Sequence, residues 1–178
     1  ITDTAVVAFD PAGGKLLWQH PYQNARGNHP DTPIYHDGLL YVTSGYGLGA
    51  IGLQLADDGL SVRRVWEQKL QDPCHGQAVL VDGYVYAASH LSAKGRWSCV
   101  EFKTGKLAWQ DEGVGRSGSV IYADRRLYGY SEDGYVGLIA PSPKACEVVG
   151  RFKVDFGEGR HWAHPTVARG RLFIRHGG

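Results

Sequence analysis

Histidine recurs at comparable positions of this 178-residue sequence, each time shortly before an apolar run that leads into a tight turn. The segments read Asn28-His29-Pro30, Cys74-His75-Gly76 and His161-Trp162-Ala163-His164, while Arg116-Ser117-Gly118 takes the corresponding place in a fourth copy. Imidazole is the commonest metal ligand and titrates near neutrality, so a metal or anion site is one interpretation. The other interpretation is a set of exposed or backbone-bonded loop histidines. If the repeated units surround a central channel, their loops lie farther apart than one metal ion can bridge. We expect no metal, and the candidate ligand-binding residues are His29, His75, Arg116, His161, Trp162 and His164.

Two arginines accompany these segments. Arg116 and Arg160 occupy nearby loop positions, and Trp162 follows the second of them. Together they would form a polar and aromatic pocket for a sugar or a small anion. A solvated rim made of the same side chains is the alternative, and we favour it. No catalytic residue is predicted.

Cysteine and glycine patterns point to no further chemistry. Cys74, Cys99 and Cys146 are odd in number and widely spaced, so they allow at most one disulfide and match no zinc spacing. We expect thiols that are free or partly buried and that behave as small apolar side chains. The Gly-rich run 45–49 opens no helix, so it lacks the phosphate-binding mechanism of a nucleotide loop and is expected to be a long inter-strand loop.

Composition gives no argument for nucleic acid or membrane as a partner. The formal charge is +1, from 19 basic and 18 acidic side chains, and no block of like charges occurs. No apolar run approaches the roughly 20 residues of a membrane-spanning helix. Glycine is abundant at 25, alongside 10 Tyr, 5 Trp and 5 Phe, which is typical of many short strands joined by tight turns.

Two independent markers repeat along the chain with a common period of about 42–48 residues. The first is an apolar strand and a Gly-containing turn that lead to a large aromatic residue, at Trp18, Trp66, Trp109 and Phe152. The second is a tight turn between apolar residues, at Asp37, Asp82, Asp124 and Arg169. Asp-Gly between alternating apolar residues is a strong hairpin signal, and each period holds about four short strands. This combination indicates the blade of a β-propeller, with a solenoid of hairpins as the alternative.

We therefore predict an all-β fold, with residues 1–178 as one propeller region of four-stranded antiparallel blades. Whole blades are expected at about 28–66, 74–109 and 115–152, with half-blades at 1–18 and 159–178. The first half-blade would supply outer strands and the last would supply inner strands, so closure within one chain, sharing with a second copy and completion by further blades all stay open. We favour an arc of a larger ring. Trp18, Trp66, Trp109 and Phe152 are expected to be structural, each packing against the neighbouring blade.

The run from Ala8 to Trp18, A-x-D-x-x-x-G-K-x-x-W, resembles the repeat of PQQ-dependent dehydrogenases and of the propeller lipoprotein of outer-membrane β-barrel assembly. From Cys74 onward the chain looks closer to bacterial PQQ-like repeat proteins, through the segments 74–76, 102–106, 131–134, 148–154 and 161–165. The resemblance implies a propeller exported to the periplasm or the cell surface. It implies little about activity, because one fold hosts many functions.

Three functions stay open. The one we favour is a non-catalytic, extracytoplasmic propeller without a cofactor, which binds a protein or small ligand on one face. The alternative is part of a quinoprotein dehydrogenase. In that family calcium-bound PQQ lies between a Trp and a disulfide of adjacent cysteines, but this sequence has no adjacent cysteine pair and no position that matches the catalytic Asp. The third is a structural arc that assembles with other chains.

Overall fold

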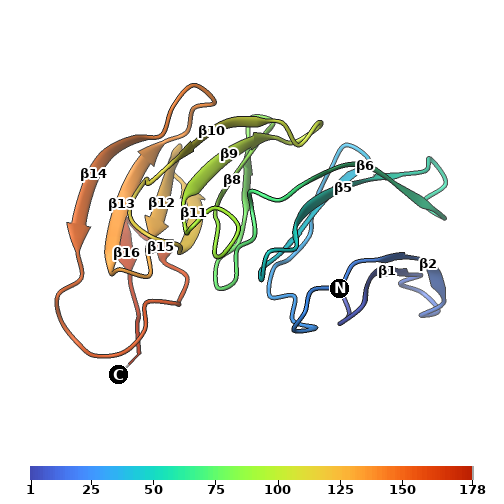
Figure 1. The fold of residues 1–178 in the computed structure, drawn as a ribbon, viewed down its shortest axis with the longest axis horizontal. Helices are drawn as coiled ribbons and strands as arrows, with labels where there is room; N and C mark the ends of the chain where they lie inside the picture. Colours follow the sequence, from blue (N-terminus) through green and yellow to red (C-terminus); the bar gives the residue numbers. More distant parts are fainter. Residues whose placement is uncertain (178) are drawn as a thin grey trace.

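A computed structural model describes residues 1–177 as an arc of antiparallel β-sheets (Figure 1). Three four-stranded sheets follow one another along the chain, and a two-stranded hairpin flanks them at each end. The all-β prediction is confirmed. The described residues contain no helix that is long and apolar enough to cross a membrane.

Within every sheet the strands are neighbours in sequence order, which is the simplest up-and-down topology. The N-terminal hairpin consists of β1 (Ala5–Phe9) and β2 (Leu16–Pro21). The first sheet contains β3 (Ile34–His36), β4 (Leu39–Ser44), β5 (Gly49–Leu55) and β6 (Val62–Gln68). The second contains β7 (Val79–Val81), β8 (Tyr84–Ala88), β9 (Trp97–Glu101) and β10 (Leu107–Asp111). The third contains β11 (Ser119–Ala123), β12 (Arg126–Tyr130), β13 (Tyr135–Ala140) and β14 (Glu147–Lys153), and the C-terminal hairpin contains β15 (Thr166–Ala168) and β16 (Arg171–Phe173).

The antiparallel order gives each sheet two distinct ends. At the turn end lie the hairpin turns that join the first two strands of each sheet. Their central residues are Asp37-Gly38, Asp82-Gly83 and Asp124-Arg125, with Arg169-Gly170 in the C-terminal hairpin. All eight residues have positive φ, between 48° and 81°, which is the signature of the two-residue type I′ turn. The mouth end is the opposite end, where the loops precede the first strands β3, β7, β11 and β15.

The repeated tryptophans lie on the outermost strand of each unit and contact the following unit at its turn end. The Trp18 indole N–H donates to the Gly59 carbonyl at 3.2 Å, and that of Trp109 donates to the Ser142 carbonyl at 2.7 Å. A Cβ atom at Gly105 would lie only 2.6 Å from Cε3 of Trp66, so glycine is required where the next sheet packs on that ring. These contacts join each unit to the next.

Phe152 departs from this pattern. Its side chain is 54% exposed on β14, although it follows the same spacing. The reason is that the described C-terminal hairpin contains two strands only, so the following unit offers no turn between third and fourth strands to cover the ring.

Two buried residues between neighbouring sheets had no periodic signal in the sequence. Trp97 on β9 is 2% exposed, and its indole N–H donates to the Gly115 carbonyl at 2.7 Å. Gln71 is fully buried, accepts a hydrogen bond from the Tyr41 hydroxyl at 2.8 Å and donates to the Val85 carbonyl at 3.1 Å. One amide therefore satisfies polar groups of both the first and the second sheet.

Candidate ligand-binding site at the mouth end

Six aromatic and cationic side chains form a continuous series across the mouth end, which we call the ladder. They come from the links that precede the first sheet, the second sheet and the C-terminal hairpin, and from the β4–β5 and β8–β9 connections. Its members, in spatial order, are Arg26, Tyr46, His90, His75, Trp162 and Arg160. The sequence had singled out His75, Arg160 and Trp162, but not the other three.

The tightest contact of the ladder joins loops of two units that are not neighbours in the chain. The His75 and Trp162 rings stack with centroids 4.0 Å apart and an interplanar angle of 15°. Arg160 lies on the same indole, with Cζ 4.4 Å from the ring centroid, in a cation–π contact. Trp162 nevertheless stays 38% exposed, so a ligand can reach it.

The other half of the ladder continues through His90 and Tyr46. The His75 and His90 rings lie 6.1 Å apart at 80°, and the His90 and Tyr46 rings lie 6.2 Å apart at 75°. The guanidinium carbon of Arg26 lies 5.6 Å from the Tyr46 ring centroid. Cationic side chains therefore occupy both ends of the series.

Asp72 holds this half in place. It is completely buried, and its carboxylate accepts backbone N–H groups of Gly47 at 3.0 Å, His90 at 2.9 Å and Leu91 at 3.0 Å. The carboxylate thus ties the turn that carries Tyr46 to the loop that carries His90. Charge-assisted bonds of this kind are the stronger ones in proteins.

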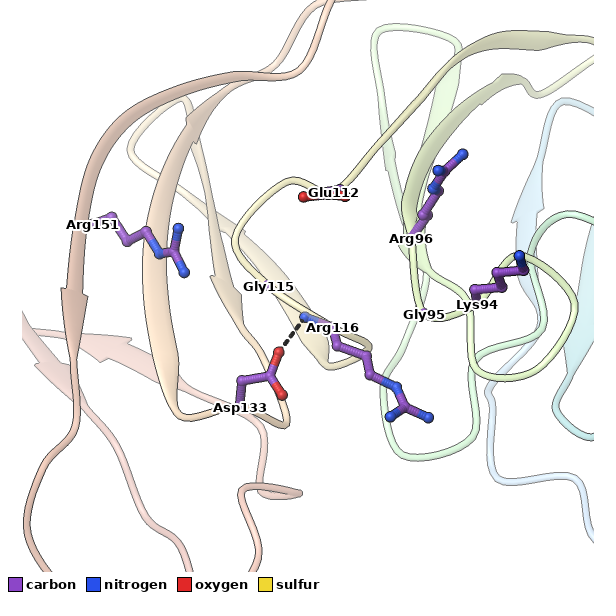
Figure 2. A pocket seen from close by; sticks show the side chains of 8 residues that line it. All are labelled: Lys94, Gly95, Arg96, Glu112, Gly115, Arg116, Asp133 and Arg151. Atoms are coloured by element: carbon purple, nitrogen blue, oxygen red, sulfur yellow. Dashed lines mark hydrogen bonds between the residues drawn. The ribbon is translucent and has the colours of Figure 1, made fainter.

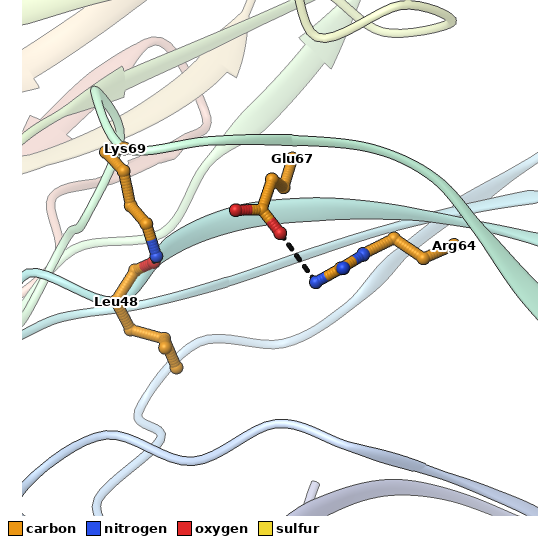
Figure 3. A network of polar contacts seen from close by, with 4 residues as sticks. All are labelled: Leu48, Arg64, Glu67 and Lys69. Carbon is orange, nitrogen blue, oxygen red and sulfur yellow. Dashed lines mark hydrogen bonds and ion pairs between the residues drawn. The ribbon is translucent and has the colours of Figure 1, made fainter.

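Lys69 also stabilises the turn that carries Tyr46. Lys69 donates from Nζ to the Leu48 carbonyl at 2.8 Å, beside an ion pair between Arg64 and Glu67 at 2.5 Å (Figure 3). The Gly-rich run 45–49, expected to be a long loop, is instead a tight connection through residues 45–48 between β4 and β5. Its compactness is what brings Tyr46 against His90.

Close backbone contacts position the half of the ladder that contains His75 and Trp162. A Cβ atom at Gly76 would lie 2.2 Å from the Gly118 carbonyl oxygen, so the loop next to His75 packs directly on the start of the third sheet. From that sheet Ser119 Oγ donates to the Ala163 carbonyl at 3.3 Å, beside Trp162. The third sheet thereby bridges the two loops whose rings stack.

Burial lowers the pKa of His75, and the charges of His90 and Arg160 lower it further, although Glu132 opposes them. The shift favours the neutral imidazole, which is suited to stack on an indole. Burial likewise raises the pKa of the Cys74 thiol. The arginines at the two ends of the ladder each carry a positive charge.

The remaining predicted residues lie at the mouth end but outside the ladder. His29 contacts Ser44 Oγ through Nδ1 at 2.9 Å. His161 bonds the Tyr130 hydroxyl, and its ring centroid is 4.6 Å from that of His176. His164 is exposed. Arg116, expected beside Trp162, instead lines a cleft between the second and third sheets.

The predicted histidines His29, His75 and His161 therefore do not converge on one point. Each of the three rings contacts residues that the other two do not contact. Within residues 1–177, no group of three or more His, Cys, Asp or Glu side chains is placed to hold a metal ion. The three cysteines Cys74, Cys99 and Cys146 are free thiols.

Asp31 is a further residue that sequence reasoning missed. It is 5% exposed, and within the described chain neither carboxyl oxygen has a hydrogen-bond partner. Burial raises its pKa to about 8, and the charge of Asp72 contributes. The corresponding position, six residues before the hairpin turn, is Gly76 in the second sheet and Gly118 in the third.

Comparison with known proteins supports the fold. A family model described as outer membrane protein assembly factor BamB matches residues 55–178. The crystal structure of BamB from Moraxella catarrhalis superposes with a TM-score of 0.71 at 16% identity, covering 99% of this chain and 52% of that one. The computationally designed Ika8 protein gives 0.60 at 12% identity over 93% and 46%, and the designed Ika4 protein gives 0.58 at 14% over 79% and 81%.

The chain thus spans about half the length of the BamB structure that it matches. At these identities the structural likeness shows the fold alone, and with it the predicted propeller class is confirmed. A search of the curated proteins found no match.

Proposed function

The chain belongs to the family of PQQ-like repeat β-propellers described as outer membrane protein assembly factor BamB, and from this membership we propose that it is a non-catalytic module that binds a protein partner through its mouth end. We propose further that residues 1–178 act as one propeller region of an exported protein, in the periplasm or at the cell surface. The family description, an assembly factor, favours a protein partner over a small ligand.

The ladder is the observation that carries this proposal. Tryptophan, tyrosine and arginine side chains often dominate the binding energy of protein interfaces, because they combine a large contact area with groups that donate hydrogen bonds. Trp162 and Arg160 provide both at an exposed position, and the stack on His75 fixes the indole in advance. A preorganised anchor loses less side-chain entropy on binding.

The family match also supports the expectation that this segment holds no cofactor. Of the two groups that hold PQQ in the dehydrogenases, the disulfide of adjacent cysteines has no counterpart in this sequence. The tryptophans at the repeated positions make contacts between units. We therefore propose no PQQ-binding site in this chain, as the dehydrogenase alternative would require.

The test is recovery of a partner from a detergent extract of the source organism's envelope, on the immobilised chain. Trp162→Ala removes the central aromatic of the ladder and should lower the recovered partner about tenfold, which corresponds to roughly 1.4 kcal/mol. Tyr35→Ala is the matched control, because Tyr35 is an exposed aromatic residue next to the turn end. Equal recovery on the Trp162→Ala chain and the unmodified chain would refute the proposal.

A further inference from the structure

A cleft of about 410 Å³ separates the mouth ends of the second and third sheets (Figure 2). Six charged side chains line it. They are Lys94 and Arg96 from the β8–β9 segment, Glu112 and Arg116 from the β10–β11 link, Asp133 from the β12–β13 turn and Arg151 from β14.

The charge balance of the cleft is positive. Four of the six side chains are cationic and two are acidic. One of the acids is already engaged, because Asp133 Oδ2 accepts the backbone N–H of Arg116 at 2.7 Å. The ion pairs of residues 1–177 are Arg64–Glu67 and Lys103–Asp37, so none of the four cations has an acidic partner in the described chain.

The loops that carry these cations are fixed to one another by their backbones. Ser117 N–H donates to the Gly95 carbonyl at 2.7 Å, and Glu132 N–H donates to the Arg116 carbonyl at 3.1 Å. Gly95 permits this approach, because a Cβ atom there would lie 2.5 Å from Cγ of Arg116. The floor of the cleft is therefore built by tight inter-sheet contacts.

Arg151 is held from the opposite wall. Its guanidinium carbon lies 3.7 Å from the ring centroid of Tyr135, a cation–π contact that fixes the side chain on the third sheet. In Figure 2 this guanidinium points from the third sheet toward the gap, whereas Arg96 lies on the side of the second sheet and the side chains of Lys94 and Arg116 extend away from Arg151. The four cations therefore line the cleft at separate positions and do not converge on a single point.

From this arrangement we propose that the cleft binds an acidic peptide segment, with carboxylates of several residues each meeting a different cation. A compact anion such as phosphate could pair with one wall only, and the remaining cations would stay unmatched. Arginine binds carboxylates in a bidentate fork, which suits an extended chain of Asp and Glu side chains. The inference rests on the proposed function, because it names the chemistry of the protein partner at the mouth end.

The experiment is isothermal titration calorimetry of the chain with a hexaglutamate peptide at low ionic strength. We expect binding that weakens with added salt. The double variant Arg96→Gln/Arg151→Gln should weaken it at least about tenfold, since charge-assisted bonds from both walls are lost. Lys144→Gln, an exposed lysine at the turn end, is the matched control and should change the affinity by less than about twofold.

A second double variant, Lys94→Gln/Arg96→Gln, leaves the Arg151–Tyr135 contact intact, so it tests the cleft if loss of Arg151 lowers the melting temperature. The inference is overturned if the unmodified chain does not bind the peptide, if both double variants bind it unchanged, or if inorganic phosphate displaces it at equal concentration. Partner recovery separates this failure from that of the proposed function. A partner that is lost with Trp162→Ala but kept by both double variants would leave the ladder proposal standing and refute the cleft.

Discussion

Replacement of the buried Asp31 carboxyl by an amide, Asp31→Asn, should stabilise the protein, and the gain should grow with pH. Burial raises the pKa of this group from an ordinary 3.8 to about 8, because neither oxygen has a partner to compensate for lost hydration. Above pH 4 the unfolded chain has released a proton that the folded chain keeps until about pH 8. The contribution of Asp31 to stability is therefore most favourable below pH 4 and falls through this window as pH rises.

The size of the effect follows from the width of the window. Each pH unit between the two pKa values changes the free energy of unfolding by about 1.4 kcal/mol. At pH 7 this carboxyl therefore lowers the free energy of unfolding by the order of 4 kcal/mol relative to its value below pH 4. This corresponds to roughly 8–16 °C in melting temperature for a chain of this size. Asparagine has nearly the same shape and does not titrate, so it removes the pH-dependent part.

The assay is thermal unfolding of the unmodified chain and of Asp31→Asn in a series of buffers from pH 5 to pH 8. The difference in melting temperature should widen steadily with pH. Asp57→Asn, at an exposed carboxyl of the turn end, is the matched control. Parallel profiles for Asp31→Asn and the unmodified chain would show that Asp31 has an ordinary pKa and would refute the reasoning.

Three further outcomes are expected. Trp109→Ala should lower the free energy of unfolding by roughly 3–5 kcal/mol in denaturant titration. The reason is that the indole packs in the second sheet and donates a hydrogen bond to the Ser142 carbonyl of the third. An unchanged midpoint would mean that the ring is dispensable. Gln71→Leu should cost roughly 2–4 kcal/mol by the same measurement, since it leaves the buried Tyr41 hydroxyl and two backbone carbonyls without their partner, and a loss below about 1 kcal/mol would contradict this. Incubation with PQQ and calcium should yield neither tight binding nor dye-linked alcohol oxidation, and any turnover above that of a heat-denatured control would revive the dehydrogenase alternative.

The hairpins could be predicted because their information is local. Asp37-Gly38 and Asp82-Gly83 carry the residues that a type I′ turn requires, and the apolar alternation around them specifies the flanking strands. The outermost-strand tryptophans could be found because the packing of similar units repeats along the chain. Trp97 escaped notice because its partners, Gly113 in the β10–β11 link and Gly129 on β12 of the next sheet, follow no spacing visible in the sequence.

The site could be predicted only in part. The sequence indicated that His75 and Trp162 precede first strands of their units, and therefore lie at the same end of the sheets. It did not indicate that the two rings stack, because that contact joins loops that are separated in the chain by the whole second and third sheets. Tyr46 and His90 were missed for a related reason: buried Asp72 brings their loops together, and its hydrogen bonds are long-range.

The central claim is that this propeller binds its partner at the mouth end. It is tested most directly by a photo-crosslinking amino acid placed at position 164 in one chain, an exposed mouth-end position outside the ladder, and at position 35, next to the turn end, in another. Each chain would be illuminated in the envelope extract, and the products identified by mass spectrometry. We predict that position 164 forms a crosslink to one discrete protein and that position 35 does not. Crosslinks to the same protein from position 35, with none from position 164, would contradict the account.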